Sequence, residues 1–120
     1  MPPLSSTPRQ APLARLSAEY AQVRAELAQL GYILQGSIIE RRIPCGKALC
    51  ACTTDPQAWH GPYIQWSRKT HGRTVSTYLT PEQAVICRQW IDNNRKLEAT
   101  LTRMRNLSRR IARAYQLPKL

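Results

Sequence analysis

The length and charge of the chain point to one small, basic domain. Its 120 residues leave room for a single domain, and a domain of this size often needs a metal ion or self-association to supplement a small core. Eighteen lysines and arginines face seven acidic residues, which gives a formal net charge of +11. This imbalance favours nucleic acid or another polyanion as the partner, with a solvated basic surface as the alternative.

No segment has the character of a membrane anchor or a secretory signal. The N-terminal stretch MPPLSSTPRQAP is rich in proline and serine, and no stretch approaches the ~20 apolar residues of a membrane span. We therefore expect a cytoplasmic protein without a membrane partner. In that reducing compartment, the four cysteines favour a metal site over disulfides.

The first predicted element is a helix over residues 13–30, preceded by a disordered lead-in over residues 1–12. Apolar side chains recur in this helix at alternating spacings of three and four, at Leu13, Leu16, Tyr20, Val23, Leu27 and Leu30. This a/d pattern favours pairing with another helix over the alternative, an ordinary amphipathic helix on a core. Gly31 suits the C-cap of the helix.

Alternating apolar and polar residues predict three strands that form a small antiparallel sheet. The first strand covers residues 33–43 and ends at Pro44, which has no N–H to donate to a ladder. The second and third strands cover residues 60–69 and 73–79. A hairpin turn at His71-Gly72 joins them, with the glycine at a position that needs positive φ.

The segment between the first two strands, residues 45–60, carries a metal-binding pattern. Cys45, Cys50, Cys52 and His60 follow a C-x4-C-x-C-x7-H spacing, and three thiolates with one imidazole form a ligand set for structural Zn²⁺. A closed set of four protein ligands argues for a role in folding rather than in catalysis. Two alternatives stay open: Cys87 replaces one of these ligands, or the cysteines are reduced and packed without a metal.

The last predicted element is a long helix over residues 80–117, followed by a tail over residues 118–120. Thr80, Pro81 and Gln83 suit the first positions of a capping box. The apolar positions of the helix are Val85, Ile86, Trp90, Ile91, Leu97, Leu101, Met104, Leu107, Ile111 and Tyr115. We expect the first half of the helix to pack on the sheet. The second half is expected to pair with the helix over residues 13–30, within one chain or between the two chains of a homodimer.

The fold prediction is therefore one α+β domain over residues 13–117. It consists of an N-terminal helix, a small three-stranded antiparallel sheet that carries a zinc knuckle, and a long C-terminal helix in a coiled-coil-like pairing.

Basic side chains fall into three groups that suit phosphate binding. They lead into the cysteine segment, surround the hairpin turn and line the end of the long helix, where no acidic residue follows Glu98. The helix dipole explains one or two charges of the last group, but not all of them. Because the guanidinium group matches phosphate oxygens, we predict that nucleic acid contacts these residues. They are Arg41, Arg42, Lys47, Arg68, Lys69, Arg73, Arg103, Arg105, Arg109, Arg110 and Arg113.

Three aromatic side chains lie among the charges of the predicted hairpin. Bases can stack on the rings of Tyr63, Trp66 and Tyr78, although we expect Trp66 to belong to the core of the sheet. Enzyme chemistry is not indicated, because there is no Gly-rich phosphate loop, no Ser/His/Asp grouping and no suitably spaced pair of carboxylates. We therefore expect a protein that is not an enzyme.

Several short motifs of the chain resemble those of a known family. The runs GSIIERR, CGKALCAC and HGPY, then a G-R hairpin turn and TYL before a long helix, are similar to a family of short bacterial proteins of uncharacterised function. Members often occur beside transposase or recombinase genes on mobile elements. The resemblance spans residues 35–112. It implies that Cys45, Cys50, Cys52 and His60 belong to one site and that the protein has a role with mobile DNA.

These observations give two functional hypotheses. The first is a zinc-stabilised accessory protein that binds nucleic acid, DNA rather than RNA, through its basic hairpin and Arg-rich helix. The alternative is a protein-interaction adaptor that dimerises or docks on a recombinase or transposase through its long helices. Reversing the charges of Arg109 and Arg110 distinguishes the two, because only the first hypothesis depends on them.

Overall fold

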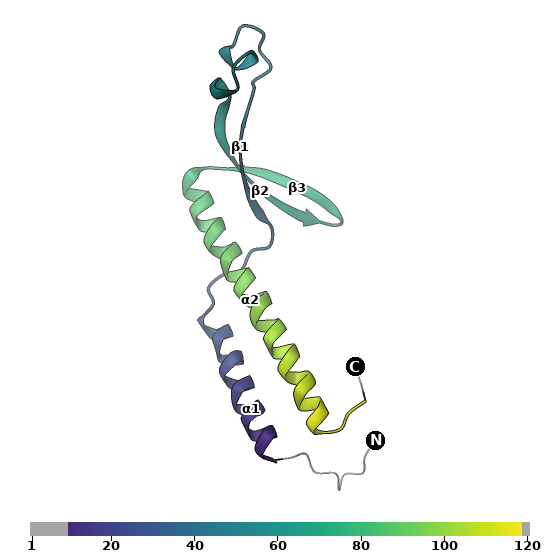
Figure 1. The fold of residues 1–120 in the computed structure, drawn as a ribbon. Coiled ribbons are helices and arrows are strands. Elements are labelled where there is room, and N and C mark those ends of the chain that lie inside the picture. Colours follow the sequence, from purple (N-terminus) through teal and green to yellow (C-terminus); the bar gives the residue numbers. More distant parts are fainter. Residues whose placement is uncertain (1–9, 119–120) are drawn as a thin grey trace. The chain divides into compact units, whose positions relative to one another are not determined.

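A computed structural model describes residues 10–118 of the chain. In chain order, its elements are α1 (Gln10–Ala25), η1 (Glu26–Gln29), β1 (Ser37–Ile43), η2 (Ala51–Thr53), η3 (Pro56–Ala58), β2 (His60–Thr70), β3 (Arg73–Leu79) and α2 (Pro81–Ala114), where η denotes a 3₁₀ helix. The predicted α+β class is confirmed: an N-terminal helix, a three-stranded antiparallel sheet and a long C-terminal helix follow one another (Figure 1).

These elements form two compact units. The helical unit contains the described residues up to Tyr32 together with those from Asn93 onward, and the sheet unit contains Ile33–Asp92. The stretch predicted as one domain, residues 13–117, is thus divided between them, and α2 contributes residues to both.

In the helical unit, α1 begins earlier than predicted. The helix starts at Gln10 rather than at residue 13, so the predicted disordered lead-in is wrong for residues 10–12, and residues 1–9 lie outside the described part of the chain. Pro12 does not prevent this start, because the N–H groups of a first helical turn have no intrahelical partner in any case.

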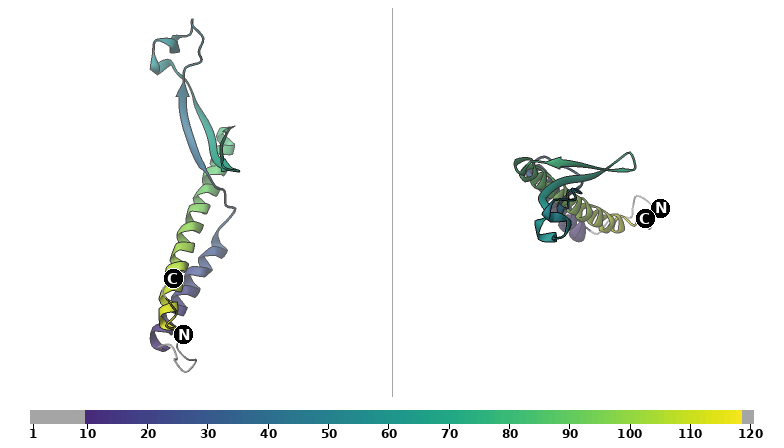
Figure 2. Two further views of the ribbon diagram at one scale, coloured as in Figure 1. Left: turned by 90° about the vertical axis from the view of Figure 1, so that its right-hand side faces the viewer. Right: turned by 90° about the horizontal axis from the view of Figure 1, so that it is seen from above.

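Apolar side chains of α1 and of the second part of α2 form the core of the helical unit. Leu16, Val23 and Leu107 are buried, and Tyr20, Met104 and Ile111 pack against them. The two helices run antiparallel and side by side in the views of Figures 1 and 2. Two contacts agree with this direction. Arg103 pairs with Glu26 at 2.8 Å, and the earlier residue Asn93 donates through Nδ2 to the later residue Tyr32 O at 2.8 Å. The predicted helix pairing therefore occurs within one chain.

The ends of these helices differ from the prediction. Leu30, in an extended conformation, caps the 3₁₀ turn that follows α1, so Gly31 is not the expected left-handed C-cap. A Cβ at Gly31 would instead lie 3.1 Å from Asn93 Nδ2, a close approach that favours glycine. The helix α2 ends at Ala114 rather than at residue 117, and Gln116 adopts the left-handed conformation with φ 57° that commonly follows a helix.

The sheet unit contains the three strands in the order β1-β2-β3, all antiparallel. Thr70 pairs with Arg73 across a two-residue turn in which His71 (φ 51°) and Gly72 (φ 77°) are both left-handed, as a type I′ hairpin requires. The strand β1 starts at Ser37 rather than at residue 33. Gly36 interrupts it with φ 118°, and a Cβ there would come within 2.6 Å of Trp66 Nε1.

The two faces of the sheet differ in character. One face carries half-buried apolar side chains of all three strands, Ile38, Ile64, Trp66, Val75 and Leu79. The other face, which we call the open face, is mostly exposed and polar. It consists of Ser37, Ile39, Arg41, Tyr63, Gln65, Ser67, Lys69, Thr74, Ser76 and Tyr78. Trp66 lies on the apolar face, as expected.

The first three turns of α2 belong to the sheet unit. Their N-terminus is a complete capping box: Thr80 N–H donates to Gln83 Oε1 at 2.9 Å, and Gln83 N–H donates to Thr80 Oγ1 at 3.1 Å. Arg88 pairs with Glu40 of β1. The predicted apolar stripe fails at its start, since Val85 and Ile86 are 65% and 46% exposed. The buried residues of these turns are Ala84 and Ile91.

Candidate metal centre and basic surfaces

The segment that joins β1 to β2 is folded by local hydrogen bonds of its own. Figures 1 and 2 show it beyond the end of the β1–β2 ladder. The carbonyl oxygen of Lys47 accepts from Cys50 N–H at 3.1 Å and from Thr53 Oγ1 at 2.9 Å. The carboxylate of Asp55 caps η3 by accepting from Gln57 N–H at 2.9 Å, with Pro56 in the first helical position. An Asp-Pro pair of this kind is a typical start of such a turn.

A β-bulge positions His60 at the entrance of this segment. The register shifts between Arg41, which pairs with Tyr63, and Ile43, which pairs with His60. Gly61 lies in the bulge with φ 123°, and a Cβ there would come within 2.8 Å of Tyr63 N and 2.9 Å of Arg41 O. Only glycine fits this conformation and this space without strain.

The guanidinium of Arg42 ties the segment to β1. It donates to Gln57 O at 2.6 Å and to Trp59 O at 2.8 Å. Trp59 directly precedes His60 and Gln57 lies three residues before it, so Arg42 helps to fix the direction from which the histidine approaches. This predicted phosphate-binding residue therefore has an internal role in the structure.

Cys45, Cys50, Cys52 and His60 converge on one point. Their ligand atoms all lie within 4.8 Å of one another. Cys45 Sγ is 3.5 Å from Cys52 Sγ, and Cys50 Sγ is 3.3 Å from His60 Nε2. The segment is largely exposed, but Cys52 is only 2% exposed, so the cluster has one side turned inward. The predicted set of four ligands is thus brought together.

These distances fit the edges of a metal-centred tetrahedron. For Zn–S bonds of about 2.3 Å and Zn–N bonds of about 2.0–2.1 Å, tetrahedral angles place two sulfurs about 3.8 Å apart, and a sulfur and a nitrogen about 3.6 Å apart. The observed 3.5 Å and 3.3 Å are slightly shorter. All four ligand atoms lie within 4.8 Å of one another, so small movements that lengthen these two distances and shorten the longest ones would bring them to the edges of such a tetrahedron.

Hydrogen bonding already favours the thiolate of Cys50. The backbone N–H of Cys52 contributes most, followed by the side chains of Cys52, His60 and Cys45, and together they lower the pKa of Cys50 to about 6. For Cys52, the backbone N–H of Cys45 at 3.4 Å also favours the thiolate. Burial and the neighbouring Cys50 and Cys45 have the opposite effect, which is larger in sum than that of this hydrogen bond, so the pKa of Cys52 is raised. Placing charge on all three sulfurs therefore calls for a cation among them.

The question of the fourth ligand is resolved in favour of His60. Cys87 is half-buried on α2 and is not part of the cluster. All four cysteines are free, so no disulfide competes with a metal for the three sulfurs. The group close enough to hold a metal ion is therefore Cys45, Cys50, Cys52 and His60.

The remaining basic residues of the sheet unit differ in how they are engaged. Arg68 lies over the ring of Trp66, 3.8 Å from its centroid, and donates to Thr77 Oγ1 at 2.7 Å, so its guanidinium is held on the apolar face. Arg41, Lys47, Lys69 and Arg73 are exposed. Among them, Arg41 and Lys69 lie on the open face.

The five arginines at the end of α2 are all exposed. Arg103 pairs with Glu26, and Arg109 donates to Asn106 Oδ1 at 3.1 Å. Arg105, Arg110 and Arg113 have no acidic partner within residues 10–118. The spacing of Arg105, Arg109 and Arg113 places three guanidinium groups in one row along the helix.

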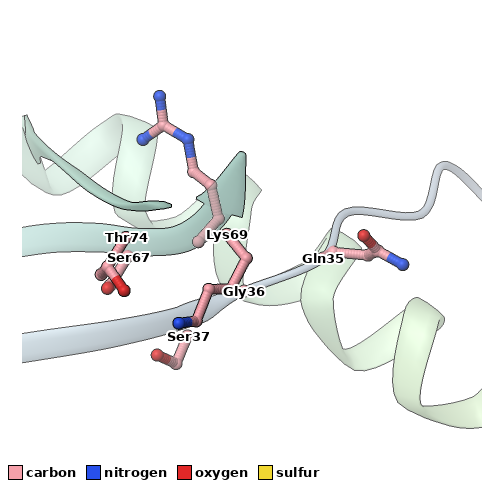
Figure 3. A pocket seen from close by; sticks show the side chains of 7 residues that line it. Gln35, Gly36, Ser37, Ser67, Lys69 and Thr74 are labelled. Atoms are coloured by element: carbon pink, nitrogen blue, oxygen red, sulfur yellow. The ribbon is translucent and has the colours of Figure 1, made fainter. Parts of the chain in front are cut away.

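A small pocket at the edge of the open face was not predicted from the sequence. Gln35, Gly36, Ser37, Ser67, Arg68, Lys69 and Thr74 line it. Figure 3 shows the hydroxyl groups of Ser67 and Thr74 close together and the Lys69 side chain extending toward Ser37. The alternation of residues along β2 and β3 predicts only which residues of the same strand share a side with Ser67 or with Thr74. Only the register of three strands brings them together with Ser37.

Within the described residues, no helix is long and apolar enough to cross a membrane.

A family model described as Domain of unknown function (DUF6788) matches residues 12–89. No curated protein and no solved structure matches the chain. The family match includes all but the first two residues of α1 and all four residues of the cluster, and it ends before the Arg-rich part of α2. The sequence motifs alone predict a resemblance over residues 35–112. Because the match covers more than half of the chain, the protein belongs to this family.

Proposed function

We propose that this family member is a non-enzymatic accessory protein that binds nucleic acid and is stabilised by a structural zinc ion. The observation that carries the nucleic-acid part is the row of exposed arginines Arg105, Arg109 and Arg113 on α2. Neighbouring members of this row are four residues apart, which places their Cβ atoms about 5–6 Å apart. No acidic residue follows Glu98 in the chain, so the row has no local neutralising charge.

The chemistry of arginine supports phosphate as the ligand of this row. A guanidinium group binds two phosphate oxygens at once, and several such groups in a row match the repeating charge of a nucleic acid backbone. The helix dipole favours a basic residue only within the last turn, which accounts for Arg113 but not for Arg105. A net charge of +11 adds long-range attraction of the same sign.

The ligand chemistry supports zinc as the metal. Three thiolates and an imidazole suit a borderline-soft cation that accepts tetrahedral geometry, and four protein ligands leave no position for a catalytic water. Elemental analysis of the purified protein should give one zinc per chain, and the Cys50→Ser variant should retain less. A native protein that is purified without stoichiometric metal under reducing conditions would contradict this assignment.

The proposed setting is the cytoplasm, with DNA rather than RNA as the nucleic acid. The choice of DNA rests on the resemblance to proteins encoded beside transposase and recombinase genes. The choice of the cytoplasm rests on the four free cysteines, which suit a reducing compartment. In this proposal, the metal holds the fold, and the arginine row contacts the DNA backbone.

Titration of labelled duplex DNA tests the proposal, with binding measured by fluorescence anisotropy over a range of salt concentrations. Each lost phosphate contact should lower the slope of log K against log salt by about 0.9. Replacing Arg105, Arg109 and Arg113 by glutamine should therefore lower the slope by about 2 to 3. The matched control replaces Arg15, Arg24 and Arg95, which removes the same charge from other positions.

Two outcomes would overturn the proposal. One is the absence of binding to duplex and to single-stranded DNA at about 0.15 M salt, where electrostatic screening is physiological. The other is an equal loss of slope in the control triple variant, which would mean that net charge alone is responsible.

A protein-interaction adaptor is the second candidate, and a specific observation favours it. Val85 and Ile86 on α2 and Leu49 between β1 and β2 are large apolar side chains exposed by 46% or more. Such residues are common at protein interfaces when they form a patch. The adaptor would dimerise or dock on a recombinase or transposase. Its association, measured by analytical ultracentrifugation, should survive charge reversal of Arg109 and Arg110.

A further inference from the structure

We infer that the open face of the sheet binds single-stranded nucleic acid, with bases stacked on Tyr63 and Tyr78 and a phosphate held by Lys69 and the neighbouring hydroxyl groups. This inference rests on the proposed function and names a second binding surface and the form of nucleic acid that it takes. It concerns the sheet unit alone.

The charge of the open face suits an anionic polymer. Arg41 and Lys69 project from this face, and none of its residues is acidic. The acidic residue of β1, Glu40, lies on the opposite face, where Arg88 neutralises it. The open face therefore carries only positive charges, although basic side chains such as Arg68 also lie on the opposite face.

Two tyrosines give one end of the open face a surface for stacking. Tyr78 is 62% exposed and Tyr63 is 38% exposed. Their ring centroids are 5.9 Å apart with an interplanar angle of 67°, so the edge of one ring lies against one face of the other, and the remaining ring faces stay open to a base. An exposed ring on a rigid strand is preorganised for a base, which stacks on it without regard to sequence.

The other end of the open face offers phosphate-binding groups. Ser67 lies four residues beyond Tyr63 on β2, about 13 Å along the strand. Its hydroxyl lines the pocket with those of Ser37 and Thr74 and with the ammonium of Lys69 (Figure 3). Hydroxyl donors around one ammonium group suit a phosphate oxygen. Because the rings and the pocket lie on one face at this separation, a short oligonucleotide can contact both.

The form of the nucleic acid follows from the rings. In a duplex, the π-faces of the bases are covered by their neighbours, whereas a single strand can unstack and place a base on a tyrosine. Duplex DNA offers only its backbone to this surface. The open face should therefore prefer single strands, while the arginine row on α2 binds the backbone of either form.

A binding experiment with two probes tests this assignment. Anisotropy is measured for a labelled oligothymidylate of about 12 nucleotides, within the usual range of single-strand site sizes, and for a labelled duplex. Loss of one stacking ring should weaken single-strand binding by about 5- to 150-fold. We expect that loss for Tyr78→Ala, near-parent binding for Tyr78→Phe, and no change in duplex binding for either variant. The matched control is Tyr32→Ala, since Tyr32 is an exposed tyrosine outside the sheet.

The salt dependence separates stacking from charge. Removing one phosphate contact to a single strand lowers the slope of log K against log salt by about 0.7. Lys69→Ala should show this change. Tyr78→Ala should weaken binding at every salt concentration without changing the slope. Each variant must retain the metal content and the circular dichroism of the parent, which both tyrosine variants are expected to do because the ring is exposed.

Three outcomes would overturn the inference while leaving the proposed function intact. The first is that Tyr78→Ala and a Tyr63→Ala/Tyr78→Ala double variant both bind the single strand within about twofold of the parent. The second is that Tyr32→Ala loses as much single-strand affinity as Tyr78→Ala. The third is that a polyglutamate peptide, which has charge but no bases, binds the parent protein as tightly as the oligothymidylate does. Absence of binding to both probes would instead overturn the proposed function itself.

Discussion

The helical unit and the sheet unit are held together in different ways. The helical unit has a conventional apolar core, in which Leu16, Val23 and Leu107 are buried. The segment between β1 and β2 has no such core: Cys52 is its one buried residue among those described, and it belongs to the metal-binding cluster. A small chain can thus use side-chain packing where two helices supply enough apolar surface. Where the chain is polar and irregular, a group of four side chains that could hold a metal ion takes the place of such a core.

The sharpest test of this contrast removes a metal ligand. Cys52→Ser should abolish stoichiometric metal binding, with a loss of affinity greater than about 100-fold, because even residues outside the ligand set of metal sites cost about 10–100-fold. Hydrogen exchange should then accelerate between β1 and β2 and remain slow at the buried positions of the helical unit. Cys87→Ser, outside the cluster, is the control and should retain the metal. If the exchange of both units accelerated together, the two units would not be separately stabilised.

The reciprocal test opens the apolar core. Leu107→Ala should lower the free energy of unfolding by about 2–5 kcal/mol, because it leaves a cavity between α1 and α2. The change is measured by urea denaturation followed by circular dichroism. Leu117→Ala removes the same atoms from a side chain that is 47% exposed and should change stability by no more than about 0.5 kcal/mol. Metal content should be unaffected by either substitution, and its loss in Leu107→Ala would contradict the separation of the units.

A substitution at the bulge tests whether the backbone positions the ligands. Gly61→Ala places a Cβ against Tyr63 N and Arg41 O in a left-handed conformation, which should cost about 1–3 kcal/mol. Because His60 is the adjacent residue, metal affinity should also fall, by about 10–100-fold. Gly72→Ala is a matched control: its φ is also positive, but a Cβ there meets no atom within 4 Å. Equal metal affinity of the two variants would mean that the bulge does not position His60.

The smallest expected effect concerns the ion pair of the helical unit. Arg103 and Glu26 are both about half exposed, so water screens their attraction. A double-mutant cycle with Arg103→Ala and Glu26→Ala should give a coupling energy of about 0.2–1 kcal/mol, falling with added salt. A larger, salt-independent coupling would show that this unit depends on charge as well as on packing.

Local signals in the sequence predicted the structure well. The capping box of Thr80 and Gln83, the hairpin turn at Gly72 and the alternation along β2 each depend on residues close together in the chain, and each is confirmed. The grouping of Cys45, Cys50, Cys52 and His60 was also predictable, because their spacing is short enough to be recognised within one segment.

Features that depend on distant residues were not predictable in this way. Gly31 is favoured by the approach of Asn93, more than sixty positions away, and not by the helix end next to it. The guanidinium of Arg42 is directed to Gln57 and Trp59 by the fold of the metal segment. Whether an arginine faces solvent or a carbonyl oxygen is decided by tertiary structure, on which composition and periodicity carry no information.

The positions of the tryptophans have a practical consequence. The chain has three of them, and Trp59, Trp66 and Trp90 all lie in the sheet unit. Their intrinsic emission therefore reports on that unit alone, and Trp59 directly precedes a metal ligand. A native, unlabelled sample thus contains its own optical probe for the unit that carries the candidate metal site, and the helical unit contributes no indole signal to it.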